Sequence, residues 1–204
     1  MAATKNIIFD LGGVLLNIDY HKTFAAFREL GVQHFEEMFT QFHVNELFEK
    51  LETGKIGEDD FYETIKTYIP QPVSNEQVAS AWYAMILDFR TESLAVLKTL
   101  SANHNLYLLS NTNSIHLKYF QKIFTRDTGQ SLLDGYFSKT WYSHVIGLRK
   151  PNKEIYEFVL QEKNLKAEET LFIDDTSDNI NAAMELGIKT HLMLPHERIE
   201  NIWL

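Results

Sequence analysis

Acidic side chains directly follow two short apolar runs in this chain of 204 residues. Asp10 follows Ile7-Ile8-Phe9, and the pair Asp174-Asp175 follows Leu171-Phe172-Ile173. A carboxylate gains nothing from packing at the end of a buried strand, whereas ligands bind at the carboxyl ends of parallel strands. Taken alone, Asp10 fits a turn after a strand equally well. Several carboxylates at one edge of a sheet repel one another, and they favour a cation with oxygen ligands such as Mg²⁺.

Two more polar groups stand in comparable places. Ser110 and Asn111 follow the apolar run 106–109, and Lys150 lies in a loop before Pro151. Each has an ordinary structural interpretation, as a helix cap or as a solvated loop residue. Beside a metal, however, a lysine and a small hydroxyl suit a phosphate group, whose charge must be neutralised on several sides. A free carboxylate then attacks phosphorus and forms an aspartyl-phosphate, which water hydrolyses.

Alternating apolar strands and amphipathic helices must position these groups. The patterns predict strands at 7–9, 106–109, 170–173 and 189–194, with a weaker aromatic candidate at 136–142. Helical spacing covers 92–100, 114–124, 153–163 and 176–186. This order predicts an α/β fold, a doubly wound parallel sheet with right-handed crossovers that forms a Rossmann-like core.

The stretch from 18 to 89 has a different character. Its aromatic residues recur at helical spacing, as in the series Phe35, Phe39 and Phe42, and one helix is predicted from about Asn75 to Leu87. We find no strand signal here. The pattern indicates an all-helical insertion after the first strand, with a small core of its own. The predicted division is a core of 1–17 and 90–204 and a helical insertion of 18–89.

Composition excludes several classes of function. The net charge of −9 argues against a nucleic-acid surface, which requires a basic patch. There is no cysteine, and therefore no disulfide framework. No apolar run is long enough for a signal peptide or a membrane span. We expect a cytoplasmic protein without a nucleic-acid or membrane partner, and the sequence leaves its oligomeric state open.

The four motifs, in this order, resemble those of the haloacid dehalogenase-like hydrolase superfamily, over essentially the whole chain. The segment 9–14, Phe-Asp-Leu-Gly-Gly-Val, is similar to the first motif, which makes Asp10 the nucleophile. The segment 109–113, Leu-Ser-Asn-Thr-Asn, is similar to the second, in which Ser110 and the backbone at Asn111 hold the phosphoryl group. In the third, Arg149-Lys150-Pro151, Lys150 balances the charge of nucleophile and phosphate.

The fourth motif, 172–176 with Asn179, implies the metal site. The resemblance gives Asp175 the direct metal-ligand place and makes Asp174 a neighbouring acid, bound through water or the lysine. Asp10 and the backbone carbonyl of Gly12 complete the ligands of an Mg²⁺ ion. The insertion matches the cap that this superfamily places between its first two motifs.

One position departs from the pattern. Most phosphatases of the superfamily carry a second aspartate two residues after the nucleophile, as acid for the leaving group and base for water, and here that residue is Gly12. General acid–base help is typically about 10²–10⁴-fold. Three explanations remain open: a leaving group that needs little protonation, such as an anomeric sugar oxygen; a proton from Asp19 or His21; or dehalogenase chemistry, in which halide leaves unprotonated.

Within the superfamily the chain is most similar to bacterial α-D-glucose-1-phosphatases. They share Asp-Leu-Gly in the first motif, Ser-Asn-Thr-Asn in the second, and glycine at the place of Gly54. The resemblance implies an Mg²⁺-dependent phosphatase whose partner is a small phosphorylated metabolite, such as a hexose 1-phosphate. The alternatives are a 2-haloacid dehalogenase and a non-catalytic phosphate-binding protein, the latter because of Gly12.

Overall fold

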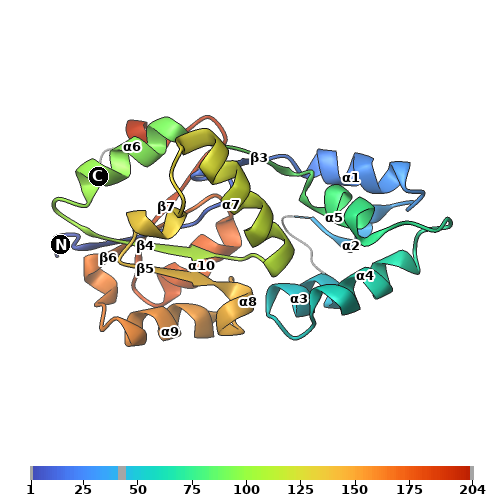
Figure 1. Ribbon diagram of the computed structural model, residues 1–204. Helices are drawn as coiled ribbons and strands as arrows, with labels where there is room; N and C mark the ends of the chain where they lie inside the picture. Colours follow the sequence, from blue (N-terminus) through green and yellow to red (C-terminus); the bar gives the residue numbers. More distant parts are fainter. Residues whose placement is uncertain (1, 41–44, 203–204) are drawn as a thin grey trace.

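A parallel sheet of five strands, in the order β5-β4-β1-β6-β7, organises the chain (Figure 1). The structure is a computed structural model and describes residues 2–40 and 45–202. All neighbouring strands of this sheet run parallel, which confirms the predicted doubly wound α/β fold. The strands are β1 (Asn6–Phe9), β4 (Asn105–Ser110), β5 (Lys139–Tyr142), β6 (Thr170–Asp174) and β7 (Lys189–Leu192).

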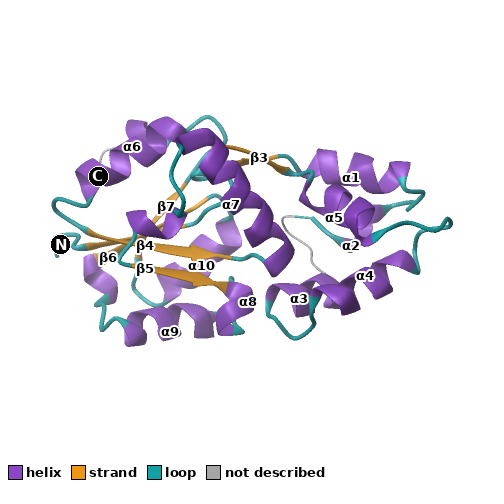
Figure 2. Ribbon diagram, viewed as in Figure 1, coloured by secondary structure: helices purple, strands orange, loops and turns teal. Residues whose placement is uncertain are grey.

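Helices cover both faces of the sheet (Figure 2). Side chains of β1 alternate between the faces: Ile7 and Phe9 pack with α6 and α7, and Ile8 packs with α9 and α10. Burial on both sides explains why the central strands β1, β4 and β6 consist mainly of apolar residues. The helices are α6 (Thr91–Leu100), α7 (Ser114–Thr128), α8 (Ser143–Ile146), α9 (Lys153–Glu162) and α10 (Ser177–Glu185), with short 3₁₀ turns η1 (Leu133–Tyr136), η2 (Ala167–Glu169) and η3 (Ile199–Asn201).

Helices α1 to α5 lie together at one end of the molecule, to the right of the sheet in Figure 1. Their inward faces carry stacked and edge-on aromatic rings, and the Phe27 and Phe35 centroids are 4.0 Å apart. Phe42, which the spacing groups with Phe35 and Phe39, lies outside the described residues. The helices are α1 (Tyr20–Glu29), α2 (Phe35–Met38), α3 (Glu46–Glu52), α4 (Glu58–Lys66) and α5 (Asn75–Tyr83).

Two short antiparallel strands join this helical group to the sheet domain, and they correct the prediction. We expected no strand between 18 and 89 and a helix as far as Leu87, but α5 ends at Tyr83, and β3 (Ile86–Phe89) pairs with β2 (Leu16–Ile18). The four residues of β3, Ile-Leu-Asp-Phe, are too few to carry a readable period. Its partner strand is some 70 residues earlier in the sequence, so local pattern does not reveal the pairing.

The predicted separate core of the insertion is also wrong. The aromatic cluster of α1–α5 is continuous with the apolar cluster between α7 and the sheet. Trp82 of α5 stacks on His116 of α7 at 4.5 Å, and Tyr83 stacks on Tyr119 at 3.8 Å. Stacked rings at two successive residues of α5 therefore pack this helix, and with it the helical group, against α7.

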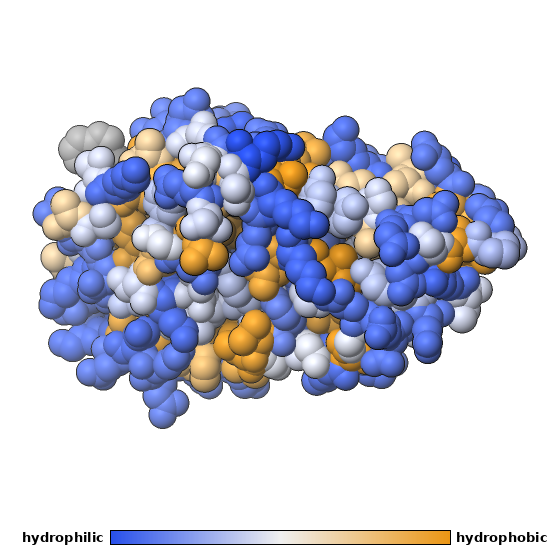
Figure 3. All heavy atoms as spheres, viewed as in Figure 1, coloured by the Kyte–Doolittle hydropathy of each residue, from blue (hydrophilic) through white to orange (hydrophobic). Residues whose placement is uncertain are grey.

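The face drawn in Figure 3 is largely hydrophilic, with hydrophobic residues in small scattered groups. Among the described residues, we find no helix with the length and apolar character that crossing a bilayer requires.

Candidate active site

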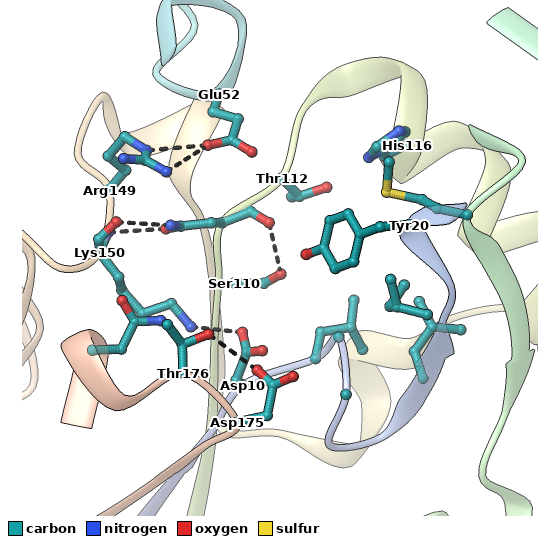
Figure 4. Close-up of a pocket in the computed structure, with 18 of the residues that line it drawn as sticks. Asp10, Tyr20, Glu52, Ser110, Thr112, His116, Arg149, Lys150, Asp175 and Thr176 are labelled. Atoms are coloured by element: carbon teal, nitrogen blue, oxygen red, sulfur yellow. Dashed lines mark hydrogen bonds and ion pairs between the residues drawn. The ribbon is translucent and has the colours of Figure 1, made fainter. Parts of the chain in front are cut away.

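A buried lysine joins two of the predicted carboxylates at the carboxyl edge of the sheet. Lys150, between α8 and α9, places its Nζ 2.6 Å from Asp10 Oδ1 (Figure 4). The same Nζ lies 2.6 Å from Asp174 Oδ2. The Lys150 side chain is only 1% exposed. Burying an ammonium is costly unless it is paired, and here each of its two partners is the residue that directly follows or ends a buried strand. Chain segments 140 residues apart therefore meet at one point.

The acidic cluster fits a divalent cation. Carboxylate oxygens of Asp10, Asp174 and Asp175 lie within 4.8 Å of one another. Burial raises the pKa of Asp10 to about 7, with Lys150 opposing the shift and the other two aspartates adding to it. Burial and the Asp174 charge raise the pKa of Asp175 to about 6. Three carboxylates beside one ammonium leave an excess of negative charge, and oxygen ligands of this kind suit Mg²⁺.

The two adjacent aspartates have different surroundings. Asp174 is fully buried, and its oxygens accept hydrogen bonds from the Thr176 backbone N–H at 2.8 Å and from Asn179 Nδ2 at 3.0 Å, besides Lys150. These donors fix Asp174 as a partner of the lysine. Asp175 instead approaches the loop after β1. The assignment of Asp175 as the direct ligand, with Asp174 bound through water or the lysine, stays a prediction.

Glycine is required at position 13 for two reasons. Its φ of +71° is left-handed, and an added Cβ would lie 2.1 Å from Asp175 Oδ2. Gly12 has no such backbone constraint. A Cβ there would lie 3.2 Å from Ile18 Cγ1, so the position has little room unless that flexible side chain shifts.

Ser110 and Asn111 stand beside the lysine, as predicted, but the Asn111 side chain is already engaged. Its Nδ2 donates to the Lys150 carbonyl at 2.8 Å, and its Oδ1 accepts from the Lys150 N–H at 2.9 Å. Asn111 thus fixes the backbone that carries Lys150. The role that the resemblance gives to the Asn111 backbone, holding the phosphoryl group, stays a prediction. The hydroxyl of Ser110, which is buried, lies 3.4 Å from the Asn111 carbonyl and lines the pocket.

A pocket of about 200 Å³ opens between the sheet edge and the helical group. This is smaller than the roughly 300–1,000 Å³ of drug-sized ligand sites, so it suits a small metabolite. The Tyr20 hydroxyl points into it (Figure 4), and burial followed by the Asp175 charge raises the pKa of Tyr20. The apolar part of the lining includes residues of β2, β3 and α7 and of the segments next to them: Leu11, Leu16, Ile18, Phe39, Met85, Ile86 and Phe120.

Neither residue considered as a substitute proton donor is among the described residues that line this pocket. Asp19 is the N-cap of α1, and its carboxylate accepts from the His21 backbone N–H at 3.0 Å. His21 is exposed. Sequence reasoning also missed the pocket residues Tyr20 and Glu52. A tyrosine and a glutamate on predicted helices carry no signal that distinguishes them from ordinary surface or core residues.

Comparison with known proteins identifies the family of this chain. The haloacid dehalogenase-like hydrolase model matches residues 4–187. A D-ribitol-5-phosphate phosphatase of Bacteroides thetaiotaomicron is 32% identical over 186 residues, which is 91% of this chain and 90% of that protein. A sesquiterpene phosphatase of Aspergillus oryzae is 30% identical over 90% of this chain and 87% of its own length.

Solved structures agree. A haloacid dehalogenase family enzyme of Bacteroides thetaiotaomicron, crystallised with magnesium and inorganic phosphate, superposes with a TM-score of 0.89, 34% identity and 96% coverage of each chain. The structure of a hydrolase of this family from Porphyromonas gingivalis has a TM-score of 0.87 and 33% identity, over 96% of this chain and 94% of its own. An L-2-haloacid dehalogenase has a TM-score of 0.56 and 17% identity, over 93% of this chain and 84% of its own. At this identity the match shows the shared fold alone. The family model and these relatives thus show that the chain belongs to the haloacid dehalogenase-like hydrolase family.

Proposed function

We propose that this enzyme is a phosphatase of a small polyhydroxylated phosphate ester, such as a hexose 1-phosphate, acting through an aspartyl-phosphate on Asp10. One observation carries the proposal: Lys150 bridges Asp10 and Asp174, within an acidic cluster whose oxygens are close enough to share one cation. The two relatives named above, which are phosphatases at 32% and 30% identity, support the proposal.

In this proposal each group has a defined role. Asp10, Asp175 and the Gly12 carbonyl would hold Mg²⁺, with Asp174 beside them, and the ion would neutralise charge on the phosphate. The Asp10 carboxylate attacks phosphorus, and the bond from phosphorus to the leaving oxygen breaks. Ser110 and the Asn111 backbone hold the phosphoryl group, and Lys150 balances its charge. Water then hydrolyses the aspartyl-phosphate, which restores Asp10 and releases phosphate.

The helical insertion of 18–89 acts as a cap on the core of 1–17 and 90–204 and limits the entry of water to the site. Because Gly12 supplies no acid, we expect a preference for leaving oxygens that need little protonation, such as the anomeric oxygen of a hexose 1-phosphate. The relative that hydrolyses D-ribitol 5-phosphate makes alditol phosphates the other substrates to test.

The test is phosphate release from a panel of hexose 1-phosphates, hexose 6-phosphates and alditol phosphates, with Mg²⁺ and with EDTA. We expect turnover of at least one ester with Mg²⁺ and its loss with EDTA. Release of halide from 2-haloacids, unaffected by EDTA, would instead identify a dehalogenase. Mg²⁺ and phosphate binding without turnover of any ester would identify a binding protein.

A further inference from the structure

The pocket holds one pair of opposite charges that the proposed chemistry does not use. Glu52 is the last residue of α3 in the helical insertion, and Arg149 belongs to the core, next to Lys150. Arg149 Nη2 and Nε lie 3.0 and 3.1 Å from Glu52 Oε2, and both residues line the pocket (Figure 4). The Glu52 side chain is 9% exposed and that of Arg149 17%. Such burial is unusual for an ion pair that serves only solubility.

The geometry of this pair leaves hydrogen-bonding capacity for a ligand. Both Arg149 contacts fall on Oε2, and no hydrogen bond from a described residue reaches Glu52 Oε1. Burial raises the pKa of Glu52, and the Arg149 charge opposes that shift. With Glu52 ionised, the two opposite charges of the pair cancel. A second phosphate or an amine on the ligand would thus find no excess of opposite charge. A hydroxyl, which both donates and accepts, matches a carboxylate acceptor beside guanidinium donors.

The position of the pair relates it to the leaving group. Arg149 directly precedes Lys150, whose ammonium touches the proposed nucleophile. Apolar side chains from β2 and β3, among them Ile18 and Ile86, line the same pocket. A polar and an apolar lining in one small pocket suit a short carbon chain that carries several hydroxyls.

We infer that the Glu52–Arg149 pair is the specificity determinant of this phosphatase, and that it recognises hydroxyl groups on the leaving group of the phosphate ester. This inference rests on the proposed function and narrows it to sugar and alditol phosphates. Alkyl and prenyl phosphates, which offer no hydroxyl, would leave the buried carboxylate oxygen without a partner.

The alternative role for the Glu52–Arg149 pair is to hold the insertion against the core, without contacting the ligand. Close by, the backbone around Gly54 packs on α8, where an added Cβ would lie 2.2 Å from the His144 carbonyl oxygen. The chain offers a matched control for docking. Glu58 of α4 pairs with Lys118 of α7 at 2.7 Å, again between insertion and core, but neither residue lines the pocket.

The experiment compares two esters with the same number of carbons, ribitol 5-phosphate and n-pentyl phosphate, for wild type, Glu52→Gln and Glu58→Gln with Mg²⁺. Replacing a charged acceptor by a neutral one weakens a hydrogen bond by about half. We expect Glu52→Gln to lower kcat/KM for ribitol 5-phosphate about tenfold and to change that for pentyl phosphate by less than about threefold. Glu58→Gln should affect both esters alike. Thermal unfolding of each variant verifies folding.

The outcomes separate the two proposals. Equal losses on both esters in Glu52→Gln, or a wild type that does not prefer the hydroxylated ester, overturn the specificity role while the phosphatase stands. A wild type that hydrolyses neither ester, nor any on the wider panel, overturns the phosphatase and the inference that rests on it. A loss confined to ribitol 5-phosphate supports both.

Discussion

At the residue scale, the site is defined by an imbalance of charge. Lys150 neutralises part of the acidic cluster, yet burial and mutual repulsion still raise the pKa of Asp10 to about 7 and that of Asp175 to about 6. Carboxylates whose pKa is raised by burial and mutual repulsion are the ones that a bound cation stabilises most in the ionised form. The same lysine holds Asp10 in place, which a nucleophile needs.

Replacing Asp10 by Asn tests the nucleophile. Asn keeps the shape and an acceptor for Lys150 but cannot attack phosphorus, so we expect turnover to fall by about 10³-fold or more. Far-UV circular dichroism should remain that of the wild type. Phosphate release on the preferred ester is the measurement, and turnover near the wild-type level would remove Asp10 as nucleophile.

At the scale of elements, a glycine sets the contact between the insertion and α8. Gly54 and Gly129 share a left-handed φ, +64° and +69°, but an added Cβ meets the His144 carbonyl at position 54 and nothing within 4 Å at position 129. Gly129→Ala should cost about 1 kcal/mol of unfolding free energy, with activity unchanged. Gly54→Ala should cost more and lower kcat/KM, because α3 no longer docks. Denaturant unfolding and kinetics of both variants check this, and equal behaviour would contradict it.

The contact between α5 and α7 has a pH dependence. Burial lowers the pKa of His116 to about 4, although its hydrogen bond with the Trp82 carbonyl opposes the shift. The unfolded chain, with a histidine pKa near 6.5, binds more protons than the folded one below that pH. Stability from this residue is therefore present above pH 6.5 and is lost as the pH falls toward 4.

His116→Gln keeps an N–H donor at the same place without titrating. Between pH 7 and pH 4.5 the wild type should lose about 2–3 kcal/mol of unfolding free energy more than the variant. Urea unfolding of both proteins at each pH is the measurement. Parallel pH profiles would show that folding leaves the pKa of His116 unchanged and would contradict this prediction.

At the scale of the whole molecule, metal binding couples to stability. The folded chain gathers Asp10, Asp174 and Asp175, which the unfolded chain leaves far apart. Mg²⁺ at 100 times its Kd should therefore stabilise the fold by about 2.7 kcal/mol, or roughly 5–10 °C in Tm for a chain of this size. Asp175→Asn should lose most of that shift. Differential scanning fluorimetry with and without Mg²⁺ measures it, and an identical shift in the variant would remove Asp175 from the ligands.

The sequence by itself determined the sheet and the groups at its edge. The central strands β1, β4 and β6 are largely buried apolar runs, and the polar residues at their ends, such as Asp10, Ser110 and Asp174, are brought to one edge by parallel topology alone. Only the tertiary structure decided what faces them. Glu52 and Arg149 are 97 residues apart and meet because the insertion docks on α8. The β2–β3 pairing and the core shared across α5 and α7 likewise depend on contacts between distant segments, which local periodicity cannot encode.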